Sequence, residues 1–319
     1  MFDFIGKRYI FFGLSILIIV AGIIGLIVNG LNLDIQFQGG TIIEIRMNDD
    51  TFDEVEAGKL VAELLGRNVT PQKSKTYNPE DPSKSFDILA LNIAKSDSAL
   101  TGEEMRMVEQ AIIEKYNLDP ATAVASELNV EPFIGREVRD NGVKALIILS
   151  ILSVIYVAFR FKAISGLSAG VFSVIALLHD VAIMFAAYTI FNIPVNELFI
   201  AAVLTIIGYS MNDKVVVYDR MRENNKLLKK MSYKELANRS IYETLSRSIN
   251  TGICCVLSLI VLIIFGKIYD ISSLVDFSFP LIIGIISGCY SSIFIASPLW
   301  VMWQESKNKK KVSNKPVKA

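Results

Sequence analysis

Residues 201–224 of the chain read AAVLTIIGYSMNDKVVVYDRMREN. The first part of this stretch is apolar for long enough to form a membrane helix, and Asn212 and Asp213 lie inside it. A carboxylate within a membrane span costs several kcal/mol unless it is paired or hydrated. The pattern therefore predicts a proton or ion site at Asp213, with a helix cap in the headgroup region as the alternative.

The rest of the chain has the composition of an integral membrane protein. Of its 319 residues, 52% are hydrophobic, and the formal net charge is zero. This balance gives no bias toward nucleic acid, so we expect no nucleic-acid partner. The sequence contains no phosphate-binding loop, metal-ligand spacing or nucleophile–base pair, and its three cysteines lie in apolar runs. We therefore expect no enzyme activity, no cofactor and no metal site.

Long apolar runs predict six transmembrane helices, because about 20 apolar residues cross the hydrocarbon of a bilayer. The runs lie at 9–28, 143–159, 164–191, 198–218, 249–265 and 277–303. The lysines and arginines of the short loops and of both ends of the chain fall on one side of this path. That side is the cytoplasm by the positive-inside rule, so both termini are expected there.

The segment between the first two spans has the pattern of a separate α+β domain. Strands are predicted at 41–47, 69–77, 86–93 and 122–130. Thr51 with Glu54, and Thr101 with Glu104, form capping-box patterns that open two helices between these strands. The resulting order, β-α-β-β-α-β, is typical of the ferredoxin-like fold.

These patterns divide the chain into four parts. They are the N-terminus with span one (1–29), an extracytoplasmic ferredoxin-like domain (30–139), a five-span membrane bundle (140–303) and a basic cytoplasmic tail (304–319). We expect the Lys-rich tail to be disordered and solvated, with anionic lipid or a ribosome as alternative contacts. Between spans four and five, residues 222–239 predict an amphipathic helix at the membrane surface, with a solvated connector as the alternative.

Three stretches give the chain a resemblance to a known family. They are LDIQFQGGT at 33–41, GYSMNDKVVVYDRMREN at 208–224 and ETLSRSINT at 243–251. Through them the chain resembles, from end to end, the SecF family of protein-export membrane subunits, which are relatives of the resistance-nodulation-division (RND) transporters. Two positions depart from the family pattern: Gln36 stands where the family has Asp, and Lys214 stands where a small hydroxyl residue is expected.

The resemblance implies half of a twelve-span transporter, located in the bacterial cytoplasmic (inner) membrane and surrounded by membrane lipid. Such a subunit acts with SecD and uses the proton-motive force to help a translocating polypeptide leave the SecYEG translocon at the outer face. The resemblance also implies that Asp213 carries protons and that Arg247 is its neighbour across the helix interface. A half-size RND-type small-molecule exporter is the alternative, and a passive assembly scaffold is a third hypothesis.

Helical spacing supports the same site independently of the resemblance. Thr244, Arg247 and Ser248 share one face of the helix that enters span five. Lys214 lies about 100° around its helix from Asp213, so it does not share the face of that carboxylate. We therefore expect Arg247 to pair with Asp213 and to hold it ionised until a proton arrives, with Lys214 as the alternative counter-ion. The position of Lys214 off the Asp213 face favours a packing or lipid-facing role.

A second polar pair, His179 and Asp180, lies within span three. Histidine changes its charge near neutral pH, so the pair is either a proton relay or a packing contact with a neighbouring span. The secondary site candidates are thus Asn212, His179, Asp180 and Ser248. Close helix approach is predicted at two motifs, Gly166-x-x-x-Gly170 and Gly284-x-x-x-Gly288, and a small polar stripe in span six is formed by Ser287, Tyr290 and Ser291.

Overall fold

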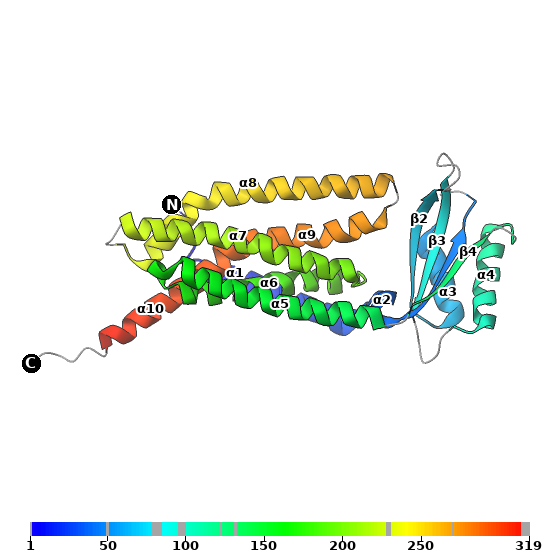
Figure 1. Cartoon of the computed structure of the whole chain (residues 1–319), viewed down its shortest axis with the longest axis horizontal. Helices are drawn as coiled ribbons and strands as arrows, with labels where there is room; N and C mark the ends of the chain where they lie inside the picture. Colours follow the sequence, from blue (N-terminus) through cyan, green and yellow to red (C-terminus); the bar gives the residue numbers. More distant parts are fainter. Residues whose placement is uncertain are drawn as a thin grey trace, which may run out of the picture.

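The structure, a computed structural model, describes residues 2–48, 51–77, 85–94, 100–120, 123–130, 133–227, 231–269 and 271–313. Two parts follow one another along the long axis: a bundle of long helices, and a smaller domain of strands and helices at one end (Figure 1). The N-terminus lies at the opposite end of the bundle. The chain therefore has a bundle of long helices and a separate, smaller α+β domain.

The bundle contains seven long helices among the described residues. They are α1 (Arg8–Asn29), α5 (Phe133–Arg160), α6 (Gly166–Phe191), α7 (Glu197–Leu227), α8 (Tyr233–Ile268), α9 (Ser272–Ser291) and α10 (Ser297–Ser313). A π-helical turn, η2 (Ser292–Ala296), joins α9 to α10 without a break. With α9, η2 and α10 taken together, six described helices are long and apolar enough to cross a membrane. The chain is a multi-pass membrane protein, as the hydropathy of its sequence predicts.

Three of these helices form the centre of the bundle. In their apolar windows, 44% of the residues of α6, 50% of those of α7 and 61% of those of α9 with α10 are buried, against 11–17% in α1, α5 and α8. The small-residue motifs let α9 approach α7 closely and let α6 approach α5 closely. A Cβ added at Gly288 would lie 3.0 Å from the Cβ of Ser210 on α7, and one at Gly170 would lie 3.1 Å from the Cα of Val154 on α5. The predicted close approaches are confirmed.

Two predictions about the segments that follow spans four and six are wrong. Residues 222–239 do not form a separate surface helix, because α7 continues to Leu227 and α8 begins at Tyr233. The start of α8 is fixed by a capping box in which the Ser232 hydroxyl accepts from the backbone N–H of Glu235. The tail is helical through Ser313, so it is not disordered over residues 304–313; residues 314–319 lie outside the described part.

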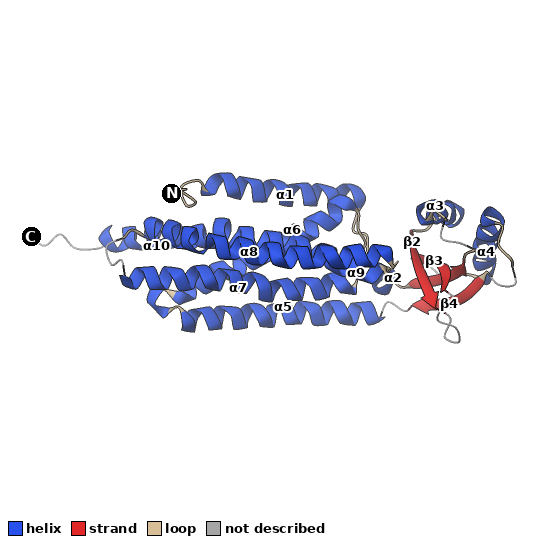
Figure 2. Ribbon diagram, turned by 90° about the horizontal axis from the view of Figure 1, so that it is seen from above, coloured by secondary structure: helices blue, strands red, loops and turns tan. Residues whose placement is uncertain are grey.

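The α+β domain has the elements β1 (Gly40–Arg46), α3 (Glu54–Leu65), β2 (Val69–Tyr77), β3 (Ser85–Ala94), α4 (Gly102–Tyr116) and β4 (Val124–Val130), in the predicted order along the chain. The sheet has the order β2-β3-β1-β4, and every neighbouring pair is antiparallel. Helices α3 and α4 lie on one face of the sheet (Figure 2). Ile43 and Leu91 pair across β1 and β3, and both are buried against Val61 of α3 and Ile112 of α4.

The caps of these two helices differ in how well the sequence predicts them. Thr101 and Glu104 form the predicted capping box of α4. The backbone N–H of Thr101, with its hydroxyl and Arg67, lowers the pKa of the Glu104 carboxyl below its usual value. The predicted box at Thr51 is wrong, because Asp53 caps α3 by accepting from the backbone N–H groups of the two residues that follow Glu54. An aspartate directly before the helix competes for the same free N–H groups.

Candidate functional site

Two buried carboxylates lie inside the helix bundle. Among the described residues, the acidic side chains that are buried are Asp180 on α6, which is 0% exposed, and Asp213 on α7, which is 8% exposed. At 1.5 Å per residue, Asp180 lies roughly 21 Å along α6 and Asp213 roughly 24 Å along α7. Both carboxylates therefore lie within the depth of a hydrocarbon core about 30 Å thick.

Hydroxyl groups surround Asp213. Its Oδ1 accepts from the hydroxyl of Ser248 on α8 at 2.5 Å, and its Oδ2 accepts from the hydroxyl of Ser292 in η2. The π-helical turn places Ser292 here, and the hydroxyl of Ser297 donates back to the Ser292 carbonyl oxygen at 2.8 Å. In the described part of the chain, Asp213 forms no ion pair. Each of its carboxylate oxygens is bound by a hydroxyl from a neighbouring element.

The structure brings only part of the predicted site together. Ser248, a secondary candidate, binds Asp213 directly. Arg247 is exposed on α8 and makes no ion pair with Asp213, because the 100° step along a helix turns it outward when Ser248 points inward. Asn212, next to Asp213 on α7, is also exposed. The expected Arg247–Asp213 contact is thus not made within this chain.

The alignment of α7 with α8 is set at the end of the 208–224 stretch. Glu243 on α8 accepts from Asn224 Nδ2 at 2.7 Å and from Arg220 Nε at 2.6 Å, both on α7. Arg239, one turn before Glu243, binds the other carboxylate oxygen at 2.9 Å. These contacts hold the two helices in one register, and in that register Ser248 lies opposite Asp213.

Asp180 is surrounded differently, because a cation is buried beside it. The ammonium nitrogen of Lys214 lies 3.2 Å from Asp180 Oδ2, and both side chains are almost completely buried. Donors to the same carboxylate are the hydroxyls of Ser210 (2.6 Å), Ser287 (2.7 Å) and Ser291 (2.8 Å). The expectation that Lys214 serves packing or faces lipid is wrong, since it forms a buried ion pair between α7 and α6.

His179 extends the Asp180 cluster toward α1. Its Nδ1 lies 3.2 Å from Asp180 Oδ1, and its Nε2 lies 3.0 Å from the hydroxyl of Ser15 on α1. Ser15 donates to the hydroxyl of Tyr290 at 3.2 Å, and Tyr290 donates to the carbonyl oxygen of Phe11 at 2.7 Å. A cavity of about 300 Å³ is lined by His179, Ser15 and Tyr290. This continuous row of polar groups connects α6, α1 and α9.

Two pairs of sequence neighbours connect the carboxylates. On α7, Asp213 and Lys214 are consecutive, and each belongs to a different cluster. At the end of α9, Ser291 binds Asp180 while Ser292 binds Asp213. A shift of α7 or of the η2 turn therefore changes both clusters together.

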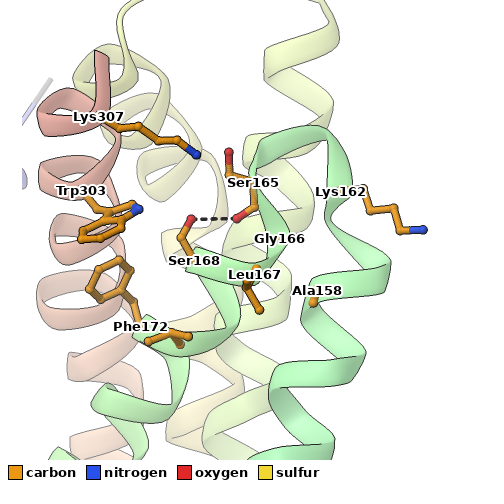
Figure 3. A pocket seen from close by; sticks show the side chains of 10 residues that line it. Ala158, Lys162, Ser165, Gly166, Leu167, Ser168, Phe172, Trp303 and Lys307 are labelled. Carbon is orange, nitrogen blue, oxygen red and sulfur yellow. Dashed lines mark hydrogen bonds between the residues drawn. The ribbon is translucent and has the colours of Figure 1, made fainter. Parts of the chain in front are cut away.

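A cavity of about 770 Å³ lies at the start of α6, near α10, away from both carboxylates (Figure 3). Its lining includes the side chains of Lys162, Lys307, Phe172 and Trp303, and the two rings meet edge to face at 6.1 Å. Its lining includes two cations and no acidic residue, so it is separate from both carboxylate clusters. In the described ranges, no group of three or more His, Cys, Asp or Glu side chains is arranged to hold a metal.

Comparison with known proteins shows which family the chain is similar to. Residues 111–306 match the family "Protein export membrane protein SecD/SecF, C-terminal". The chain is 33% identical to the protein translocase subunit SecF of Anaerolinea thermophila over the full length of both chains. It is 34% identical to the protein translocase subunit SecDF of Bacillus subtilis, covering 97% of this chain and 39% of that protein.

Solved structures of longer chains are similar as well. The crystal structure of SecDF, a translocon-associated membrane protein from Thermus thermophilus, matches with a TM-score of 0.72 at 32% identity. The match covers 95% of this chain and 39% of that one. A second crystal structure of SecDF, in its super-membrane-facing form, also gives a TM-score of 0.72 and covers 98% of this chain.

Proposed function

Because the chain belongs to the SecD/SecF family of protein export membrane proteins, we propose that it works as a SecF-type subunit of the protein-export machinery. It acts with a SecD-type partner beside the SecYEG translocon in the bacterial cytoplasmic membrane, with both termini in the cytoplasm. It uses the proton-motive force to help a polypeptide leave the translocon at the outer face. The names of its relatives, all protein translocase subunits, support this role over small-molecule export.

The observation that carries the proposal is the environment of Asp213. A carboxylate within a span is expensive when charged, and here hydroxyls from Ser248 and Ser292 are its partners in place of a cation. Proton uptake removes that charge, and each hydroxyl then faces a neutral acid in place of a carboxylate. Because Ser248 lies on α8 and Ser292 in η2, the protonation state of Asp213 biases how α7 packs against both.

The exposed polar residues of α7 and α8 support the proposal that this chain binds a SecD-type partner. Asn212 and Arg247 face outward from helices that cross the hydrocarbon, where an unpaired arginine is costly. In the SecDF relatives the counterpart of this chain is one part of a longer polypeptide. We assign the surface around Asn212 and Arg247 to the interface with the SecD-type partner, which supplies a carboxylate for Arg247 and completes the proton pathway.

The exterior domain, residues 30–139, contacts the emerging polypeptide and has a ferredoxin-like fold. Its β-α-β-β-α-β order and its antiparallel sheet, with β1 and β3 at the centre, support that fold assignment. The five-span bundle (140–303) uses the proton gradient to drive changes in helix packing. Lysines at the cytoplasmic end of the bundle contact lipid headgroups. Lys162 and Lys307, which both line the cavity at the start of α6, mark this end.

The test uses proteoliposomes that contain the full chain, a SecD-type partner and the translocon. Asp213→Asn is expected to abolish the stimulation of export by an imposed proton gradient, while the complex still copurifies. Asp219→Asn, six residues further along α7 and paired with Arg160 and Arg222 near the helix end, is the matched control and keeps the stimulation. Full gradient-dependent export by Asp213→Asn would overturn the proton-carrier role. Loss of assembly in that variant would instead favour a scaffold.

A further inference from the structure

Lys214 is completely satisfied inside the bundle. An ammonium group has three N–H donors and no acceptor. Lys214 Nζ lies 3.2 Å from Asp180 Oδ2 and 3.0 Å from the hydroxyl of Ser291, and it also contacts the hydroxyl of Ser210. These three oxygens match the three donors, and the carbonyl oxygen of Ser210 follows at 3.5 Å. The group has no remaining donor for another partner.

Asp180 orients the two hydroxyl groups so that their oxygens face the ammonium group. Ser210 and Ser291 each donate their hydroxyl hydrogen to Asp180 Oδ2 and accept from Lys214 with a lone pair. The other carboxylate oxygen, Oδ1, is bound by Ser287 and His179. The ammonium group therefore occupies a cage formed by one carboxylate oxygen, two hydroxyl oxygens and one carbonyl oxygen. Oxygen sets of this composition bind hard cations in proteins.

The cage is a built site, since its side chains are buried and come from separate helices. Asp180 is on α6, Ser210 on α7 and Ser291 on α9, and all three are 0% exposed. Gly288 lets α9 come near enough to α7 to bring Ser291 and Ser210 to the same nitrogen. The charge of the cage is balanced by Lys214, which reaches it from the next turn of α7, four residues after Ser210.

We infer that Lys214 is a tethered cation that fills a monovalent-cation site at Asp180 and thereby excludes Na⁺ or K⁺ from the centre of the bundle. The inference goes beyond the proposed function, which rests on Asp213 in the neighbouring cluster. It makes Lys214 a residue that determines ion specificity: with the ammonium group in place, the cage has no vacancy, and a mobile ion cannot couple to the packing of α6, α7 and α9.

Replacing Lys214 by threonine removes the ammonium group from the oxygen cage. The variant leaves the Asp180 carboxylate with His179 and the serine hydroxyls as partners and removes the ammonium group that pairs with it. A buried charge that loses its partner is strongly destabilising. A free cation of suitable size restores the balance by binding the same oxygens, with the new threonine hydroxyl available as a further ligand. Anything that binds the folded state alone raises its melting temperature in a saturable way.

The experiment measures melting of the full chain in lipid nanodiscs in NaCl, KCl or choline chloride at constant ionic strength. Lys214→Thr is expected to melt a few degrees higher with increasing Na⁺ or K⁺ and to show saturation, and the two salts distinguish which ion fits. The wild-type chain is expected to melt at one temperature in all three salts. The double variant Asp180→Asn/Lys214→Thr, which lacks both charges, is the matched control and is also expected to be insensitive.

Three outcomes overturn the inference. In the first, Lys214→Thr folds but melts at the same temperature in every salt. In the second, the double variant shows the same ion dependence, which places the ion elsewhere. In the third, Lys214→Thr fails to fold in every salt. If the cage accepted Na⁺ or K⁺, the bound ion would replace the lost charge and the variant would fold in that salt. Folding of this variant in NaCl or KCl but not in choline chloride supports it.

Discussion

Gly288→Ala tests whether the close approach of α9 to α7 builds the Asp180 cluster. A Cβ at this position would lie 3.0 Å from both the Cβ and the Oγ of Ser210 and 3.4 Å from its Cα. Carbon atoms in contact prefer about 3.5–4.0 Å, so the helices must separate by roughly 0.5–1 Å. The hydroxyl of Ser210 donates to Asp180 at 2.6 Å, and this separation stretches that bond or moves Lys214. Overpacking of this kind costs about 1–3 kcal/mol.

The control for Gly288→Ala is Gly208→Ala on α7, where an added Cβ meets nothing within 4 Å. Alanine favours a helix over glycine by about 1 kcal/mol, so this control is expected to be neutral or stabilising. Thermal unfolding of the two variants in nanodiscs, followed by tryptophan fluorescence, compares one added methyl group at a contact with one in open space. A Gly288→Ala variant that melts at or above the temperature of Gly208→Ala would refute the packing argument.

Two further predictions concern the ends of the chain's elements. Thr101→Ala removes the cap of α4 and is expected to destabilise this helix by about 1 kcal/mol, seen as faster hydrogen exchange in its first turn, whereas Thr101→Ser, which keeps the hydroxyl, exchanges like the wild type. Hydrogen bonding from Lys234, followed by Gly6 and Asn238, lowers the pKa of Asp3 to about 2. Because the folded pKa lies below the unfolded value of about 3.9, Asp3 stabilises the fold above pH 4 and loses this effect as the pH falls toward 2. The melting temperatures of the wild type and Asp3→Asn should therefore converge on acidification, and a constant difference would contradict this.

Local features of the sequence predict the local structure well. Apolar length predicts the spans, Thr101 with Glu104 predicts a helix start, and Gly284 with Gly288 predicts a close helix contact. Each of these signals lies within one continuous stretch of sequence. A similar signal at Ser232 and Glu235 was available and marks the true start of α8.

The partners of the buried carboxylates are harder to predict, because they come from distant parts of the chain. The stripe of Ser287, Tyr290 and Ser291 indicates a polar face on span six but not which carboxylate it meets. Ser292 reaches Asp213 through a π-helical turn, whose wider repeat changes the facing of the residues within it, and regular helical spacing does not predict such a turn. The step of 100° correctly separates Lys214 from Asp213 but does not show that Lys214 points inward to Asp180.

The two clusters differ in the charge that a proton or ion meets there. At Asp180 the ammonium group of Lys214 already balances the carboxylate, so the cluster is neutral and its hydroxyls are committed to both groups. At Asp213 the hydroxyls stabilise a carboxylate that has no described cation, so one proton changes the net charge of the cluster. On α7 and at the α9–η2 junction, two consecutive residues belong one to each cluster. The ion pair of Lys214 and Asp180 thus links α7 to α6, whereas the carboxylate of Asp213 is bound by hydroxyls from α8 and η2.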